Sequence, residues 1–309
     1  MRVGVTIAAG DLAPRRPRSF GEMVEDAVEA ERLGYDSVWV MDHFLVERDG
    51  SRSPAGPDPM TLLAYIAART ERIQLGTLVA CAAFRPPAQL AREAKALQEA
   101  SGGRLLLGVG AGWHQPEFDA FGFPFDHLVG RFEEYLEVLC GLLGEGPRDF
   151  EGRYQRLRQG QVFGPPVPPP WVAAFGPRML ALTGRLAGGW NSAWHGAGTQ
   201  TFTTGLAAVE AALAAAGRSR SELVASAGVF AVPLEGAELA EAELKLAQAG
   251  QPGLGERAVS GSAVAVAEAL RGYARAGCEH LVLNFSPSPF RSLTPGLAAR
   301  LAPLLDRLR

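Results

Sequence analysis

The sequence predicts an α/β fold of the (β/α)8 TIM-barrel class, with insertion segments at the C-terminal face of the barrel. Eight short apolar segments alternate with helical patterns along the chain, and this alternation is typical of parallel strands with helical crossovers. A length of 309 residues suits one such barrel. We therefore expect a single domain over residues 1–309, with insertions near 145–170 and 235–257. An open, doubly wound sheet is the alternative, and the count of eight units disfavours it.

The expected strands are short apolar runs bounded by glycine, proline or polar residues. They lie at residues 3–8, 37–41, 73–81, 104–109, 171–174, 189–194, 225–232 and 281–285. The expected helices repeat apolar residues at the helical period and cover residues 20–33, 59–68, 87–100, 129–143, 204–216, 262–276 and 297–308, with a further helix opening at Gly176. Ser19 and Ser262 are typical N-cap residues, and Pro59 suits a first helical turn. Gly34 is typical of a helix end.

The two insertions interrupt this alternation. Residues 145–170 are polar and then contain five prolines between Pro165 and Pro170, which exclude a helix or a central strand there. We expect this segment to lie across one rim of the barrel. Residues 235–257 contain one charged helix and a glycine-rich loop. Because long irregular segments of barrels often act as lids, both insertions are candidates for closing over the site.

The composition is that of an ordinary soluble globular protein, with 47% hydrophobic and 20% charged residues. A net charge of −3 gives no electrostatic basis for binding nucleic acid. No segment approaches the roughly 20 apolar residues of a membrane span, and the first residues lack the pattern of a signal peptide. Cys81, Cys140 and Cys278 stand far apart in apolar sequence, as expected of reduced thiols. We therefore expect a cytoplasmic protein without nucleic-acid or membrane partners.

A glycine-rich strand end within residues 104–117 is the most distinctive stretch of the chain. Gly108, Gly110 and Gly112 carry no side chain, and bulk returns at Trp113. Glycine inside a strand marks a close approach to the backbone, and a wide aromatic side chain beside it predicts a pocket for a flat ligand. The dinucleotide fingerprint requires its third glycine where Trp113 stands, which excludes a Rossmann site.

The carboxyl ends of barrel strands carry the active site, and this rule selects the catalytic candidates. The second strand ends at Asp42 and His43. His43 is a candidate for moving a proton near neutral pH, with Asp42 as the group that orients it; a structural histidine is the alternative. Glu117, after the fourth strand, is a second catalytic candidate. His114 and Glu117 lack a third ligand at a suitable spacing, so we expect no metal site.

Gly176-Pro177-Arg178 predicts a further site after the fifth strand. Proline suits the first turn of a helix, where its missing N–H has no cost. Free amides at such a helix start, together with a guanidinium, favour a phosphate. An ordinary helix that begins at proline is the alternative.

The chain resembles the bacterial luciferase-like superfamily of flavin- and deazaflavin-dependent oxidoreductases. The matching motifs are Leu33–Phe44, Gly76–Val79, Gly103–Trp113, Arg131–Glu133, Gly176–Arg178, Gly189–Asn191 and Ala276–Leu281. The resemblance implies an enzyme with a (β/α)8 barrel and an insertion segment. The alternating glycines before Trp113, followed by Glu117, are similar to the branch that uses the deazaflavin coenzyme F420; FMN is the alternative cofactor.

The resemblance also implies the roles of the site residues. The cofactor ring would lie across the C-terminal mouth of the barrel, with His43 approaching it. A non-proline cis peptide bond between Leu78 and Val79 would support the ring, and a helix start would hold the phosphate. The expected cofactor-binding residues are Asp42, His43, Leu78, Val79, Gly110, Gly112, Trp113, Ala174, Phe175, Gly176 and Pro177.

Two positions depart from the sugar-phosphate branch of the superfamily. Members that act on sugar phosphates carry a carboxylate at the position of Trp113 and a tryptophan soon after the Asp-His-Phe motif, where this chain has Glu47. Trp113 therefore indicates a more apolar substrate.

Three functional hypotheses follow. The first is hydride transfer between C5 of F420 and a small organic substrate, with His43 as proton donor or acceptor. The second is an FMN-dependent monooxygenase that uses oxygen and receives electrons from a separate flavin or F420 reductase. The third is a non-catalytic flavin-binding protein. The resemblance further implies a homodimer.

Overall fold

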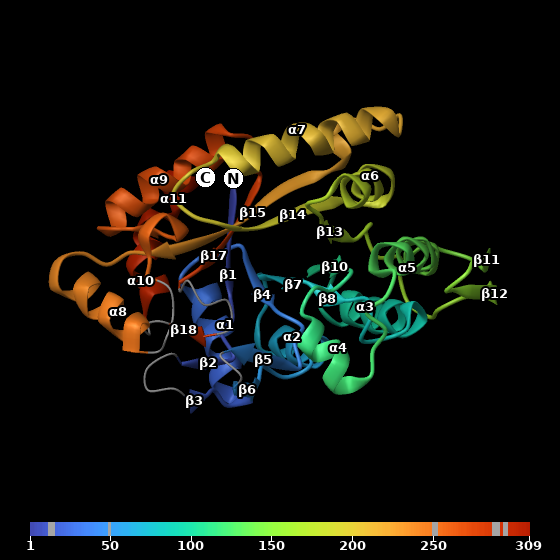
Figure 1. Cartoon of the computed structure of the whole chain (residues 1–309), viewed down its shortest axis with the longest axis horizontal. Helices are drawn as coiled ribbons and strands as arrows, with labels where there is room; N and C mark the ends of the chain where they lie inside the picture. Colours follow the sequence, from blue (N-terminus) through green and yellow to red (C-terminus); the bar gives the residue numbers. More distant parts are fainter. Residues whose placement is uncertain (12–15, 49–50, 249–252, 286–290, 293–295) are drawn as a thin grey trace.

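Eight parallel strand positions form a closed barrel in the computed structural model, and helices surround it (Figure 1). In chain order the strands are β1 (Arg2–Thr6), β4 (Ser37–Val40), β7 with β8 (Gln74–Thr77, Ala80–Cys81), β9 with β10 (Leu105–Leu106, Gly108–Gly110), β13 (Trp171–Ala173), β14 (Gly189–His195), β15 (Val224–Val232) and β17 (His280–Asn284). Each position pairs in parallel with the next one, and β17 pairs with β1. The predicted TIM barrel is therefore confirmed.

The helices of the outer layer follow the strands as expected. They are α1 (Phe20–Arg32), α2 (Pro59–Arg69), α3 (Pro87–Ala100), α5 (Leu128–Leu143), α6 (Pro177–Leu186), α7 (Gln200–Ala215), α9 (Ala263–Arg275), α10 (Leu297–Leu301) and α11 (Leu305–Leu308). Ser19 and Ser262 cap α1 and α9 as predicted, because each hydroxyl accepts a hydrogen bond from an amide of the first turn. Asp58 does the same at α2, before the predicted Pro59.

Two tryptophans fill the interior of the barrel. The rings of Trp39 on β4 and Trp171 on β13 lie 5.5 Å apart, and His280 on β17 packs edge-on against both. Because β4 and β13 are not neighbours in the barrel, this contact crosses its interior. A Cβ atom at Gly76 would lie 2.2 Å from the ring of Trp39. Glycine in β7 therefore makes room for the tryptophan of the neighbouring strand β4.

Residues 145–170 differ from the expected irregular segment across the rim. They contain an antiparallel hairpin of β11 (Arg148–Glu151) and β12 (Arg156–Gly160). The hairpin packs on α5, where the Glu134 carboxylate accepts hydrogen bonds from the three amides of residues 153–155. The segment joins the end of α5 to the start of β13, which is the amino end of a barrel strand (Figure 1). The connection therefore begins at the end of the barrel opposite to the site.

Smaller elements complete the connections between the strands and the outer helices. They are α4 (Gln115–Phe121), α8 (Gly236–Gln248), the hairpin of β5 (Leu45–Arg48) and β6 (Ser51–Pro54), the short strands β2 (Gly10–Asp11), β3 (Arg16–Pro17), β16 (Val259–Ser260) and β18 (Arg291–Ser292), and the 3-10 turns at Arg220–Glu222, Gly255–Arg257 and Ala302–Leu304. Helix α4 was not expected, although Pro116 in its first turn and Gly122 at its left-handed C-cap are helix signals.

The structure describes residues 1–11, 16–48, 51–248, 253–285, 291–292 and 296–309. Residues 249–252 of the second expected insertion therefore lie outside the described residues. Within the described ranges, no helix is both long and apolar enough to cross a membrane. All three cysteines are unpaired thiols, as predicted.

Candidate active site at the carboxyl end of the barrel

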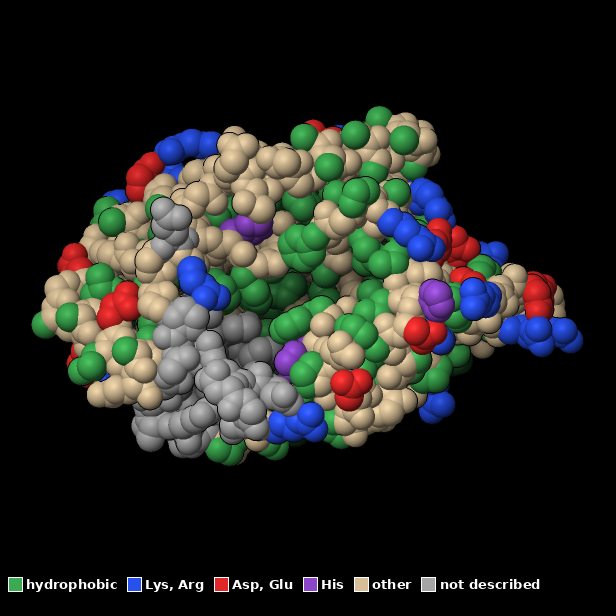
Figure 2. Space-filling view, in the orientation of Figure 1, with side chains coloured by type: hydrophobic (Ala, Val, Ile, Leu, Met, Phe, Trp, Pro, Cys, Tyr) green, Lys and Arg blue, Asp and Glu red, His purple; other side chains and the backbone are tan. Residues whose placement is uncertain are grey.

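A cavity of about 1250 Å³ opens at the carboxyl ends of the strands, and we call it the central cavity. Figure 2 shows a hollow near the centre of this face, with hydrophobic side chains on its walls. Ten of the twelve predicted site residues line it: Asp42, His43, Leu78, Val79, Gly110, Gly112, Trp113, Glu117, Phe175 and Gly176. Ala174 and Pro177 are absent from the lining. The buried Ala174 carbonyl accepts a hydrogen bond from the Trp190 indole, and Pro177 begins α6.

His43 and Glu117 form the polar centre of one wall. Nδ1 of His43 lies 2.8 Å from Oε2 of Glu117, whose side chain is 1% exposed. The other oxygen of Glu117 accepts hydrogen bonds from the amides of Phe44 and Leu45, at 2.6 and 3.2 Å. A carboxylate only accepts, so Nδ1 of His43 donates and its Nε2 is the basic nitrogen of the neutral ring. Glu117 therefore fixes both the position and the tautomer of His43.

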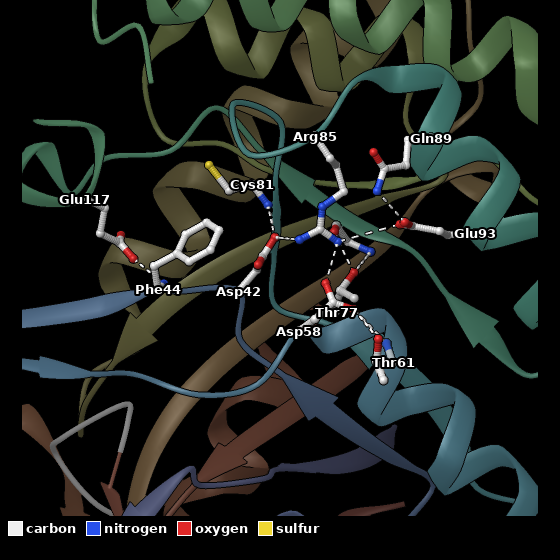
Figure 3. A network of polar contacts seen from close by, with 11 residues as sticks. Asp42, Phe44, Asp58, Thr61, Thr77, Cys81, Arg85, Gln89, Glu93 and Glu117 are labelled. Carbon is white, nitrogen blue, oxygen red and sulfur yellow. Dashed lines mark hydrogen bonds and ion pairs between the residues drawn. The ribbon is translucent and has the colours of Figure 1, made fainter. Parts of the chain in front are cut away.

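Asp42 does not orient His43 as the sequence suggested. Its carboxylate accepts hydrogen bonds from the amide of Cys81 and from the Arg85 guanidinium, at 2.9 and 2.8 Å (Figure 3). Arg85 also lies 3.3 Å from Asp58 and 3.8 Å from Glu93. Burial raises the pKa of Asp42 to about 6. One guanidinium shared by three carboxylates offsets this rise only in part.

The three glycines of the fourth strand make room for protein atoms. A Cβ atom at Gly108 would lie 2.0 Å from the carbonyl oxygen of Thr77, and one at Gly110 would lie 2.7 Å from Val79. Gly112 has a φ of +90° and would clash with Phe118. The expectation that these positions leave bare backbone for a ligand is therefore wrong at Gly108. Gly110 instead lets Val79 reach the cavity wall, where the predicted cis bond joins it to Leu78.

The helix start at α6 differs from the predicted phosphate site in one respect. Gly176 is the N-cap of α6 and lines the cavity, as does the exposed ring of Phe175. The guanidinium of Arg178 instead pairs with Glu133 of α5 at 2.7 Å and does not line the cavity. The amides of the helix start remain available for an anion, without that cation.

Three polar residues on this cavity, Asn191, His195 and Arg257, are not among the predicted site residues. Asn191 of β14 is buried, and its Nδ2 has no hydrogen-bond partner among the described residues. Ser226 donates to the Asn191 oxygen at 2.6 Å, so the amide nitrogen is the group left to donate. His195 is bonded to Ser192, and burial lowers its pKa. Arg257 is the one Lys or Arg in the described cavity lining.

The surroundings of Cys81 determine its protonation state, and the positions of the His, Cys, Asp and Glu side chains bear on metal binding. Burial raises the pKa of Cys81 to about 12, so the residue is a neutral thiol near neutral pH. Within the described ranges, no three His, Cys, Asp or Glu side chains gather in a way that could hold a metal ion. Glu117 is directed to His43, not to His114.

Known proteins are similar to this chain in sequence and in architecture. An F420-dependent glucose-6-phosphate dehydrogenase from Kineococcus radiotolerans is 30% identical over 99% of this chain and 97% of that protein. A protein of the same name from Amycolatopsis mediterranei is 33% identical over 61% of this chain, and the match spans 56% of that protein. The solved structure of an F420-dependent secondary alcohol dehydrogenase superposes with a TM-score of 0.82 at 18% identity, covering 100% of this chain and 99% of that one.

Residues 1–280 match the family described as luciferase-like monooxygenase. This segment contains the whole of the first seven barrel strands, His43, Glu117 and every other residue of the central cavity. The protein therefore belongs to the luciferase-like family of F420- and flavin-dependent oxidoreductases.

Proposed function

We propose that this enzyme transfers a hydride between coenzyme F420 and a small, largely apolar organic substrate. The observation that carries the proposal is the His43–Glu117 pair on the wall of a large cavity at the mouth of the barrel. The cofactor preference is supported by the full-length relative whose name specifies F420.

The residues of the central cavity fit a flat heterocycle with a phosphate-bearing tail. The buried Asn191 Nδ2 lacks a partner in the described part of the chain and provides a donor for a ring carbonyl. Val79 and Ala173 give an apolar floor. The amides at Gly176 and the side chain of Arg257 favour the phosphate. When bound, the deazaflavin supplies the hydride acceptor or donor at C5.

The side chains of this chain would position the substrate and move one proton. Because Glu117 fixes the tautomer of His43, the basic nitrogen Nε2 is the atom that would exchange a proton with the substrate oxygen. Trp113 is 66% exposed and lies 5.8 Å from the His43 ring. Its indole would cover the substrate and exclude water from the reacting atoms.

The cavity wall favours an apolar substrate over a sugar phosphate. The stacked pair of Trp194 and Phe230 lines one side, with ring centroids 5.0 Å apart. Arg257 is the single cation of the described lining, and the cofactor phosphate competes for it. A second phosphate would therefore lie in the cavity without a matching charge.

Titration of the protein with F420 and with FMN tests the cofactor, by quenching of protein fluorescence. We expect the dissociation constant for F420 to be at least about tenfold lower than that for FMN. A panel of secondary alcohols, ketones and enones, with glucose 6-phosphate as comparison, then tests hydride transfer through the visible absorbance of F420. Tighter binding of FMN would favour the monooxygenase hypothesis, binding without turnover would favour a non-catalytic protein, and preference for glucose 6-phosphate would contradict the proposed substrate class.

A further inference from the structure

Glu117 stands on a short helix with a small apolar anchor. Helix α4 has seven residues, of which Glu117 and Phe118 are the buried ones. A helix of this length is not stable by itself in water, so contacts with the rest of the protein must fix its position. The ring of Phe118 packs on the backbone at Gly112, where a Cβ atom would lie 2.6 Å from it. One buried ring fixes a point of the helix but not its direction, so a further contact must set where the Glu117 carboxylate lies.

Phe44 supplies this further contact. Its ring centroid lies 4.6 Å from that of Phe121, with an angle of 33° between the ring planes. Phe121 follows Glu117 by four residues, so the two lie one turn apart on the same face of α4. The amide of Phe44 donates to Glu117 at 2.6 Å (Figure 3). Phe44 therefore holds α4 at two points, through its main chain at Glu117 and through its ring at Phe121.

Two further rings complete a phenylalanine cluster that consists of Phe44, Phe84, Phe121 and Phe123. The centroids of Phe84 and Phe123 lie 4.9 and 5.7 Å from that of Phe44 and 5.0 Å from each other. Aromatic pairs at such distances attract one another beyond the effect of their buried area. The cluster therefore joins the segment after β4 and the loop before α3 to α4 and the residues that follow it.

The position of α4 determines two hydrogen bonds of the segment that carries the imidazole. His43 and Phe44 lie between β4 and β5, outside both strands, so their positions depend on bonds other than those of the barrel sheet. One oxygen of Glu117 accepts from Nδ1 of His43, and the other accepts from the amide of Phe44. A displacement of α4 would therefore disturb both bonds together.

We propose that Phe44 and Phe121 are positioning residues, which hold the Glu117 carboxylate against His43 and so keep the ring proton on Nδ1. Neither phenylalanine is among the described residues that line the central cavity, so both act through Glu117. The inference rests on the proposed function in one respect: the basic Nε2 of His43 exchanges a proton with the substrate.

NMR of the Phe44→Ala and Phe121→Ala variants tests the position of Glu117 directly. The carbonyl of residue 44 accepts a hydrogen bond from the amide of Ala55, which does not depend on the ring, so we expect the first variant to fold. In both variants the 15N shifts of His43 should move from the Nδ1–H tautomer toward a mixture of the two tautomers. The amide of Leu45, which is also bonded to Glu117, should exchange with solvent about tenfold faster. The double variant should show no larger change than either single one, because the two rings form one contact.

Two further variants separate positioning from a general loss of aromatic packing. Phe44→Tyr keeps the ring on a side chain that is 42% exposed, and it should retain the tautomer and the slow exchange of Leu45. Tyr65→Ala is the matched control. Tyr65 of α2 is 51% exposed and packs edge-on against Phe20 at 5.6 Å, and its loss should leave both signals unchanged.

Turnover then links the position of Glu117 to the reaction. Phe44→Ala should lower kcat about tenfold and leave the dissociation constant of F420 within about twofold. Wild-type His43 shifts and Leu45 exchange in both alanine variants would overturn the inference, as would equal changes in Tyr65→Ala. Failure of the wild type to bind F420 would overturn the proposed function, and the NMR comparison would still decide whether the two rings position Glu117.

Discussion

Nδ1 of His43 lies 2.8 Å from a carboxylate oxygen of Glu117, 74 residues further along the chain. The same carboxylate holds the two amides that follow His43, so one buried side chain fixes both the imidazole and the backbone that carries it. This relationship links the second and fourth strands at the barrel mouth and makes Glu117 a positioning residue.

Glu117→Gln should lower kcat about 10- to 100-fold and leave the dissociation constant of F420 within threefold. The amide presents an N–H to His43, which forces Nδ1 to accept and shifts the ring proton to Nε2. The 15N shifts of His43 in histidine-labelled protein report this tautomer directly. An unchanged tautomer, with kcat unchanged, would contradict the role given to Glu117.

His43→Asn should lower kcat about 100-fold or more, because it removes the proton donor or acceptor, and should retain F420 binding. His127→Asn is the matched control. His127 lies outside the central cavity with a φ of 51°, a conformation that asparagine tolerates. Equal turnover by the two variants would show that His43 is structural.

Arg85→Met should lower the free energy of unfolding by about 3–5 kcal/mol, since Asp42 and its neighbours lose the buried cation that they share. Arg69→Met, which removes an exposed pair with Glu25, should cost less than about 1 kcal/mol. Urea denaturation of both variants at pH 7 gives the comparison. Similar losses in the two would mean that burial of the Arg85 network is unimportant.

Gly76→Ala should destabilise the barrel by about 3 kcal/mol, because the added methyl group would lie 2.2 Å from the ring of Trp39. Gly21→Ala in α1 meets no atom within 4 Å and should leave the stability unchanged or raise it by up to about 1 kcal/mol. Thermal unfolding followed by circular dichroism tests the pair. A stable Gly76→Ala protein would mean that Trp39 can move aside.

His280 should lower the free energy of unfolding at acid pH. Burial lowers its pKa from 6.5 to about 3, so the folded state stays neutral where the unfolded state gains a proton. The free energy of unfolding is therefore not reduced by this histidine well above pH 6.5. It falls as the pH drops toward 3, by about 1.4 kcal/mol per pH unit. His280→Gln does not titrate and can keep a bond to Ser37. Between pH 6.5 and pH 5 the free energy of unfolding of the wild type should therefore fall by about 2 kcal/mol more than that of the variant. Urea denaturation at the two pH values measures this.

The sequence by itself determined the barrel, because strand and helix patterns are local and repeat along the chain. The limits of α3 and the caps of α1 and α9 were predicted, since capping residues act on their own first turn. The strand-end rule also brought His43, Trp113 and Glu117 to one cavity.

Only the tertiary structure decided which groups touch. Asp42 stands next to His43 in the chain, yet its side chain turns to Arg85, and the distant Glu117 takes its place. Both residues follow the end of β4 at Val40, where no strand alternation fixes the direction of a side chain. Adjacency along the chain therefore could not reveal this exchange. The packing at Gly108 and the unpartnered amide of Asn191 depend on contacts between strands far apart in sequence. Such contacts leave no periodic signal, because they are set by the closed geometry of the barrel and not by any local pattern.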